Sequence, residues 1–257
     1  MMELALVQYA FQHCLRKGFQ PVMTPDVVRT YVAAACGYRP RGEASQVYHI
    51  KDTDKCLVGT AEIPLAGMYV DTILTAKQLP INLVAFGHAF RHEVGHRGQE
   101  TRGLYRVHQF SKVEMFSFTI PEESEAQLER MLESQVEFFT SLGLHFRVLN
   151  MPANDLGASA AKKYDIEAWM PSRDDFGEVS SASNCLDYQS RRLNIRHRLL
   201  PTEPTTFVHT VNGTACAIPR VILALLECNQ QKDGSILIPP VLQPFMGGLT
   251  HITQPRL

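Results

Sequence analysis

The sequence predicts an α+β fold in which a central antiparallel sheet is flanked by helices, in one domain that spans residues 1–257. Three observations support this prediction. Two extended arms flank a Gly- and charge-rich loop between Phe90 and Phe116, short apolar runs follow one another in the second half of the chain, and two segments with strong helical periodicity lie among them. Together these elements make an antiparallel sheet with helices on its faces.

The chain opens with a helical pattern that ends near Gly18. The segment GFQPVMTPD then predicts a strand that runs into Pro25, and a polar stretch over residues 40–55 predicts a loop with short strands. A further helix begins at GTAE, where Thr60 is well placed as a cap. The first helix carries an apolar stripe that consists of Leu4, Val7, Phe11 and Leu15.

The clearest helix spans Pro121 to Leu142, with proline and acidic residues in its first turn and Gly143 at its end. The last helix spans Ile218 to Cys228, and Pro219 is tolerable in its first turn. The tail after Pro239 is rich in proline and glycine, so we expect it to be partly loose. Between the two helices, strands are predicted at HFRVL (145–149), IEAWMP (166–171), EVSS (178–181) and FVHTVN (207–212).

The arms of the hairpin carry charge where strands of a buried sheet should be apolar. Side chains alternate between the two faces of a strand, so the second arm places Arg106, His108, Phe110, Lys112 and Glu114 on one face. Phe110 and Glu114 are then separated by about 13 Å, which is the span of an aminoacyl-adenylate. If the arms pair as a hairpin, Arg91 falls opposite the region between them.

A planar guanidinium at that position suits a phosphoryl oxygen and a carboxylate together. The pattern therefore indicates a site for an extended anionic ligand. The alternative is an ordinary amphipathic hairpin with a salt-bridged outer face, and the pattern alone leaves that alternative open.

The residues of this hairpin resemble motif 2 of class II aminoacyl-tRNA synthetases, specifically of the seryl-tRNA synthetases, in FRHE (90–93) and RGLYRVHQFSKVE (102–114). Three further blocks agree in order and spacing: GTAE (59–62), EVSSASNCLDYQSRR (178–192) and NGTACAIPR (212–220). Four ordered blocks are far more specific than one short motif. The resemblance covers nearly the whole chain and implies the class II synthetase fold.

The resemblance also implies a reaction: ATP and serine form seryl-adenylate, and the seryl group is transferred to tRNA-Ser. It implies Mg²⁺ at Glu178 and Ser181, and it gives Arg91 and Arg220 the catalytic roles. It implies serine contacts from Thr60, Ala61, Glu62, Arg91, Glu114, Asn212 and Thr214. It implies ATP contacts from Arg91, His92, Glu93, Arg106, Val107, Phe110, Glu178, Val179, Ser180, Ser181 and Arg220.

Within those sets, the resemblance places adenine on Phe110, with Glu93 accepting from its amino group. Arg220 covers the other face of the ring and reaches the γ-phosphate. Glu114 and Thr214 lie on the hydroxyl side of serine, and Thr60 and Glu62 lie nearer the ammonium group. Before the resemblance is considered, a helix cap is as good an account of Thr60 as serine binding.

The family form of the last block has glycine where Ala215 and Pro219 stand, and this variant looks more like the mitochondrial branch than the bacterial one. A location in the mitochondrial matrix is therefore expected, with the cytoplasm as the alternative. The first helix, strand and Pro25 resemble motif 1, the dimer element, so a homodimer is expected. The long coiled-coil arm that grips tRNA in full-length seryl enzymes is expected to be missing, because no heptad run occurs here.

Composition excludes some classes of protein. The net charge of −1 argues against a broadly basic nucleic-acid surface, so any RNA contact must be local. No apolar run approaches the roughly 20 residues that span a bilayer, so no membrane partner is expected. Two rival functions remain: a synthetase-like paralogue that has lost catalysis and serves as a binding or regulatory subunit, and an adenylating enzyme for another small amino acid.

Overall fold

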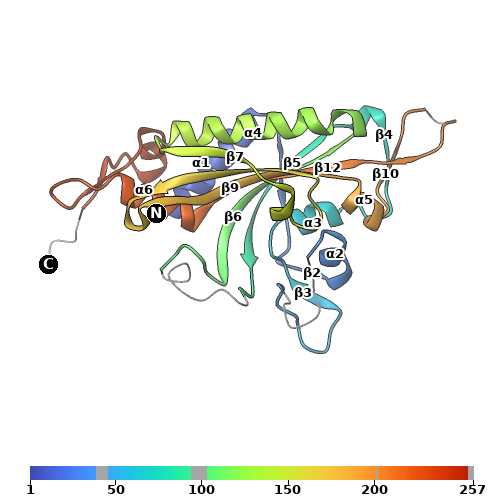
Figure 1. Ribbon diagram of the computed structural model, residues 1–257, viewed down its shortest axis with the longest axis horizontal. Coiled ribbons are helices and arrows are strands. Elements are labelled where there is room, and N and C mark those ends of the chain that lie inside the picture. Colours follow the sequence, from blue (N-terminus) through green and yellow to red (C-terminus); the bar gives the residue numbers. More distant parts are fainter. Residues whose placement is uncertain (39–45, 94–102, 201, 254–257) are drawn as a thin grey trace.

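A computed structural model describes residues 1–38, 46–93, 103–200 and 202–253. Its centre is a seven-stranded sheet (Figure 1). Neighbouring strands run antiparallel except at one edge, where β1 pairs with β5 in parallel, so the sheet is mixed rather than wholly antiparallel as predicted. In sheet order the strands are β1 (Gln20–Met23), β5 (Ile81–Phe90), β6 (Gln109–Thr119), β12 (His209–Ala217), β9 (Asp175–Leu186), β8 (Lys162–Met170) and β7 (Phe146–Asn150).

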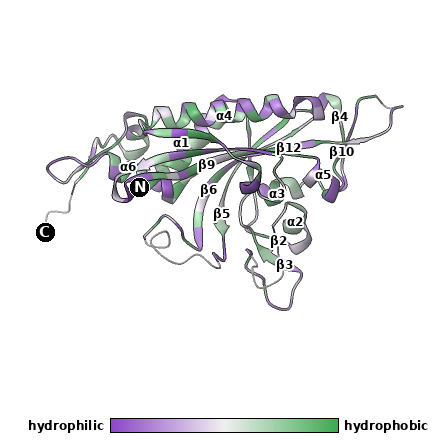
Figure 2. Ribbon diagram, viewed as in Figure 1, coloured by the Kyte–Doolittle hydropathy of each residue, from purple (hydrophilic) through white to green (hydrophobic). Residues whose placement is uncertain are grey.

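One face of this sheet is covered by three helices: α1 (Met2–Arg16), α4 (Ser124–Ser141) and α6 (Ile218–Cys228). Val113 and Met115 of β6 point into the core beneath them, with Leu128 and Met131 of α4. Hydrophobic and hydrophilic residues alternate along α4 in Figure 2, as expected for a helix with one face on a sheet. The helices predicted over 121–142 and 218–228 are confirmed.

The opposite face is divided into two parts. Phe116 and Phe118 of β6 are buried there, under α2 (Thr30–Ala35), α3 (Glu62–Gly67) and α5 (Tyr188–Leu193). The earlier residues of the same strand face, from Phe110 to Glu114, lie instead in a cleft beside these helices. One alternating strand thus runs from a hydrophobic core into a polar cleft, and this explains its charged residues.

Smaller sheets and turns complete the fold. The sheets are β11-β10-β4, formed by Thr206–Phe207, Arg196–Arg198 and Ile73–Thr75; β2-β3, formed by Val27–Arg29 and Lys55–Leu57; and β13-β14, formed by Ile236–Leu237 and His251–Ile252. Short 3₁₀ turns occupy Ala76–Gln78, Pro121–Glu123, Ala153–Asp155, Pro171–Arg173 and Pro240–Met246. Within the described ranges, no helix has both the length and the apolar character needed to cross a bilayer.

Two expectations about packing need correction. Val7 and Phe11 of the expected α1 stripe pack against the core, but Leu4 and Leu15 are 65% and 46% exposed, while Leu6 and Tyr9 of the adjacent face are buried. The tail is packed over its described residues 240–253, because the Pro240–Met246 turn lies on α1 and buries Leu242; residues 254–257 lie outside the described part. The proline and glycine residues there form turns that direct apolar side chains into the core. Their abundance in the sequence predicted a loose tail, because composition does not show which turns pack.

Candidate functional site

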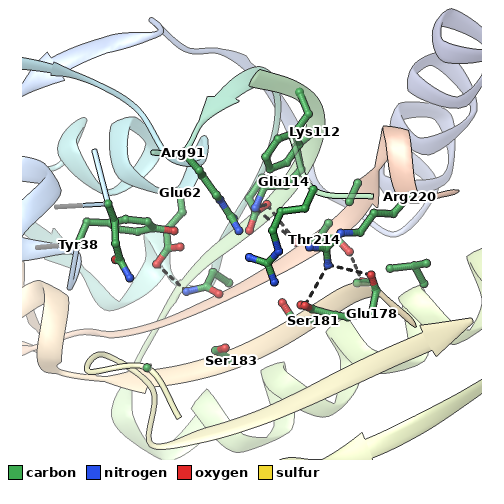
Figure 3. A pocket seen from close by; sticks show the side chains of 18 of the residues that line it. Tyr38, Glu62, Arg91, Lys112, Glu114, Glu178, Ser181, Ser183, Thr214 and Arg220 are labelled. Atoms are coloured by element: carbon green, nitrogen blue, oxygen red, sulfur yellow. Dashed lines mark hydrogen bonds and ion pairs between the residues drawn. The ribbon is translucent and has the colours of Figure 1, made fainter. Parts of the chain in front are cut away.

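The cleft on the open half of the sheet has a volume of about 580 Å³, within the ordinary range of small-molecule sites. Its floor consists of β6, β12 and β9, and its rim includes the start of α6 and the loop around Ser159. In Figure 3, Tyr38 and Glu62 lie at one end, Glu178 and Arg220 lie at the other, and the Arg91 side chain points into the space between them.

The cleft brings together most of the residues expected from sequence. Three of those residues do not line it: Thr60 and Ala61 are buried at the start of α3, and His92 packs its ring against Tyr48. Thr60 Oγ1 accepts a hydrogen bond from the Glu62 amide at 3.3 Å, but the N-cap of α3 is Ala61 and no side chain caps the helix, so the expected capping role of Thr60 is wrong. The expected residues that do line the cleft are Glu62, Arg91, Glu93, Arg106, Val107, Phe110, Glu114, Glu178, Val179, Ser180, Ser181, Asn212, Thr214 and Arg220.

Arg91 reaches the cleft by a different geometry from the one predicted. The register pairs Ala89 with Phe110, and the Arg91 amide donates to the His108 carbonyl, so the Arg91 backbone lies beyond Phe110 rather than between Phe110 and Glu114. The side chain folds back along the cleft, where its Nε donates to the Gly59 carbonyl and its guanidinium lies 5.3 Å from the centre of the Phe110 ring.

At the Phe110 end, Glu93 Oε2 accepts from Arg106 Nη1 at 2.7 Å. Glu93 has a φ of 47°, in the left-handed region that non-glycine residues enter at some cost. Such backbone is common where a chain must aim one side chain into a site. Phe110, Glu93 and Arg106 together present an aromatic face, an acceptor and a cation to one region of the cleft.

Arg220, at the start of α6, is held by two residues, Tyr105 and Glu178. Its Nε donates to the Tyr105 carbonyl at 3.0 Å, its Nη1 donates to the carbonyl and the carboxylate of Glu178, and its guanidinium lies 4.5 Å from the centre of the Tyr105 ring. Arg173 lies 4.2 Å from the centre of the same ring. Pro219 occupies the first turn of α6, so the helix start is intact despite the departure from the family pattern.

Glu178 and Ser181 are three residues apart on β9, where the pairing with β8 shifts register, and both line the cleft near each other (Figure 3). Burial acts to raise the pKa of Glu178, but Arg220, Lys163 and Arg91 outweigh it and hold that pKa below its ordinary value. A carboxylate that stays ionised beside a hydroxyl suits a hard cation such as Mg²⁺, which takes one or two carboxylates and completes its shell with phosphates and water. No cluster of three His, Cys, Asp or Glu suited to a metal occurs in the part of the chain that the structure describes.

At the other end of the cleft, Glu62 is buried and accepts two amide hydrogen bonds. Gln189 donates to its Oε1 at 2.5 Å, and Asn212 donates to the same atom at 2.8 Å. Gln189 is itself oriented by Thr210, which donates to its carbonyl oxygen. Burial, together with the charge of Glu114, raises the pKa of Glu62 to about 7. The charge of this carboxylate is therefore poorly compensated, and a cation that binds beside it at neutral pH would stabilise its ionised form.

Beside it, Lys112 and Glu114 form an ion pair at 2.5 Å, with side chains only 7% and 3% exposed. Thr214, across the sheet on β12, contacts both: its Oγ1 lies 3.5 Å from Lys112 Nζ and 3.4 Å from Glu114 Oε2. The Thr214 backbone is fixed from below, because Gln135 of α4 donates to its carbonyl and to that of Ser181. One amide of α4 therefore ties β12 to β9 beneath the cleft floor.

Several residues of the cleft were not predicted as site residues: Tyr38, Tyr105, Lys112, Ser159, Lys163 and Ser183. Alternation along the strand had already put Lys112 on the same face as Phe110 and Glu114, so the sequence could have identified it as a site residue. For the others no local pattern exists, since they lie on loops or on neighbouring strands. Six cysteines have no disulfide partner in the described parts of the chain, and all except Cys228 are buried.

Comparison with known proteins agrees with this arrangement. Residues 47–229 match the family model described as "tRNA synthetase class II core domain (G, H, P, S and T)". The chain is 49% identical over 249 residues to a serine–tRNA ligase of Rhodopirellula baltica, and 48% identical over 260 residues to the mitochondrial serine–tRNA ligase of Bos taurus. These alignments cover 96% and 99% of this chain, and 58% and 50% of the two relatives.

Among solved structures, the fold is similar to that of a seryl-tRNA synthetase from Pyrococcus horikoshii complexed with ATP. The TM-score is 0.95 with 44% identity, over 99% of this chain and 56% of that one. The chain thus spans between half and three fifths of the length of these relatives. The bacterial and mitochondrial relatives are about equally similar, so identity does not distinguish the two branches.

Proposed function

We propose that this chain, which belongs to the class II tRNA synthetase core family, is the catalytic domain of a serine–tRNA ligase over residues 1–257. It activates serine with ATP to seryl-adenylate and transfers the seryl group to the 3′ end of tRNA-Ser. The observation that carries this proposal is the cleft itself. An aromatic and cationic end at Phe110 is joined through Arg91 to an acidic end at Glu62 and Glu114.

The chemistry requires alignment rather than proton transfer. The carboxylate of serine is already ionised at neutral pH, so it attacks the α-phosphorus without a general base. Arg91 points between the two ends of the cleft, where it holds the serine carboxylate and the α-phosphate together and neutralises charge that develops on phosphorus. Arg220 binds the outer phosphates of ATP. Phe110 stacks on the adenine ring, and Glu93 accepts a hydrogen bond from the adenine amino group.

In the serine subsite, Glu62 receives the ammonium group, while Glu114 and Thr214 receive the hydroxyl. Asn212 supports Glu62 through the hydrogen bond that its side-chain amide donates to Glu62 Oε1. Thr60 and Ala61 act by positioning Glu62 at the start of α3. A hydroxyl-binding subsite of this kind discriminates strongly, because alanine leaves its polar groups without a partner.

Mg²⁺ fits the Glu178 and Ser181 pair, because Glu178 is a carboxylate that already attracts a cation: Arg220 Nη1 lies 3.1 Å from its Oε2. When bound, the ion supplies positive charge for the phosphates of ATP. The side chains of the protein orient this region without it: Lys163 pairs with Asp165 at 2.7 Å next to the cleft, and Arg220 anchors to β9.

The remaining partners follow from the same proposal. A second copy of the chain binds at α1 and the edge strand β1; the apolar surface that Leu4, Leu15 and Met23 expose there supports this part of the proposal. tRNA-Ser approaches the open side of the cleft. The compartment is the mitochondrial matrix or the cytoplasm, and the absence of disulfides in the described parts of the chain agrees with the reducing conditions of both.

The direct test is serine-dependent exchange of pyrophosphate into ATP by the whole chain. We expect exchange with serine and at least about 100-fold less with alanine or threonine, because the hydroxyl subsite rejects the first and the buried walls reject the second. Equal exchange with alanine would favour an adenylating enzyme for another small amino acid. No exchange by pure, folded protein would favour the inactive paralogue and would contradict the proposal.

The KM for serine should depend on pH through Glu62. Its pKa is raised to about 7 mainly by burial and by Glu114, opposed by Lys112, Gln189 and Arg91. The ammonium of serine needs the ionised carboxyl, so KM should be constant above pH 7.5 and rise up to about 10-fold per pH unit below 7. Glu62→Gln should have a high KM that is nearly independent of pH between 5.5 and 8.5. A wild-type KM that stays flat over this range would contradict the assignment.

A further inference from the structure

The two carboxyl groups of the acidic end differ in what compensates their charge. Glu114 has a cation at 2.5 Å, the ammonium of Lys112. Glu62 instead accepts from two neutral amides, those of Gln189 and Asn212. Both carboxyl groups are buried, at 2% and 7% exposure, so a cation beside one of them changes how each responds to an incoming ligand.

The sheet makes room for Lys112 in this place. Its cross-strand neighbours are Gly87 on β5 and Ala217 on β12, two of the smallest side chains available. The long lysine side chain can therefore lie along the face of the sheet and reach Glu114, two residues further on the same face (Figure 3). A buried lysine flanked in this way and aimed into a ligand cleft needs more than a packing explanation.

We propose that Lys112 is a positioning residue that determines serine specificity by assigning different roles to Glu62 and Glu114. Lys112 satisfies the charge of Glu114 and fixes it, through Thr214, as an acceptor for a hydroxyl group. Glu62 then remains the carboxylate without a cation, so the ammonium of the amino acid goes there. This inference rests on the proposed function. It adds to that function the residue that decides which of the two acids binds the hydroxyl and which binds the ammonium.

Without Lys112, the two acids would compete. Glu114 would be a buried carboxylate with no cation, next to a second acid whose proton affinity is already raised. It would take up a proton, so the serine hydroxyl would lose its ionised acceptor. Serine would then be held less firmly in line with the α-phosphate. Alanine has no hydroxyl to lose, so it should suffer much less than serine.

The test compares Lys112→Met with wild type in ATP–pyrophosphate exchange by the full chain, with serine and alanine as the amino acids. We expect kcat/KM for serine to fall about 100-fold and that for alanine to change less than about 5-fold, so that the serine-to-alanine ratio collapses. Lys112→Arg, which keeps the positive charge, should recover part of the ratio. A folded Lys112→Met variant that keeps the wild-type ratio would overturn the proposal.

A double-variant cycle separates a positioning role from a structural one. In a Glu114→Gln background the neutral amide needs no cation, so adding Lys112→Met should change serine kinetics by less than about 3-fold. The Lys112→Met/Glu114→Gln variant also removes both charges together, which keeps the test available if Lys112→Met alone does not fold. Additive effects of the two substitutions would count against the proposal.

A binding measurement distinguishes this inference from the function on which it rests. Serine should raise the unfolding temperature of wild type more than alanine does, and Lys112→Met should lose that difference, without any need for turnover. Wild type that binds serine selectively but gives no exchange would contradict the proposed function alone. Wild type that gives exchange, with Lys112→Met still selective for serine in both measurements, would contradict only the role of Lys112.

Discussion

Arg91→Gln should lower kcat for serine-dependent ATP–pyrophosphate exchange by about 1,000-fold, equivalent to about 4 kcal/mol of transition-state stabilisation. The reason is the position of the guanidinium, which points into the middle of the cleft between its two ends. It contacts the Gly59 carbonyl and the Phe110 ring, so it is held in place before ligands bind. Because its charge is needed most when charge develops on phosphorus, KM should change far less than kcat.

Two controls sharpen this prediction. Arg91→Lys keeps a positive charge but loses the planar fork, so it should recover only part of the rate. Arg147→Gln removes an arginine from β7, at the far edge of the same sheet, where it pairs with Glu167. It should exchange at nearly the wild-type rate. If Arg91→Gln raised the KM for serine and the KM for ATP and left kcat unchanged, Arg91 would be a binding residue only.

The geometry of Arg91 also shows where sequence reasoning reaches its limit. Alternation correctly placed Phe110, Lys112 and Glu114 of β6 on one face in the cleft, because that period is a local property of a strand. It failed before the strand begins at Gln109: His108 hydrogen-bonds to Tyr48 and does not line the cleft, whereas Val107 does. The pairing of the two arms depends on the length and path of the loop between them, and so the predicted register was wrong. The loop at residues 94–102 lies outside the described residues.

A similar division applies to the rest of the fold and site. Helices with proline at the start and a strong stripe, such as α4 and α6, were predictable from local sequence. The partners Gln189 and Gln135 were not, since each reaches the cleft floor from a helix distant in sequence. The buried face of α1 was also missed in part, because the small residues Ala5 and Ala10 are buried beside Leu6 and Tyr9, while Leu4 and Leu15 stay exposed.

Arg220→Met should raise the KM for ATP in the exchange reaction by about 100-fold at saturating serine, with a smaller fall in kcat. Each charge-assisted contact to phosphate contributes about 1.5–3 kcal/mol, and methionine retains only the packing of the side chain. Arg220 is positioned by hydrogen bonds to Tyr105 and Glu178, so little ordering of its side chain is needed when ATP binds. Direct ATP binding, measured by calorimetry, should weaken in parallel.

Arg173→Met is the matched control, because Arg173 stacks on the same Tyr105 ring at 4.2 Å but does not line the cleft. Removing it takes one cation from the ring and leaves Arg220 with all its hydrogen bonds, so the KM for ATP should change less than about 5-fold. Equal losses in the two variants would mean that the stacked ring, rather than the guanidinium of Arg220, determines ATP binding. Unequal losses, with Arg220→Met far more affected, would assign the contact with the outer phosphates to Arg220 itself.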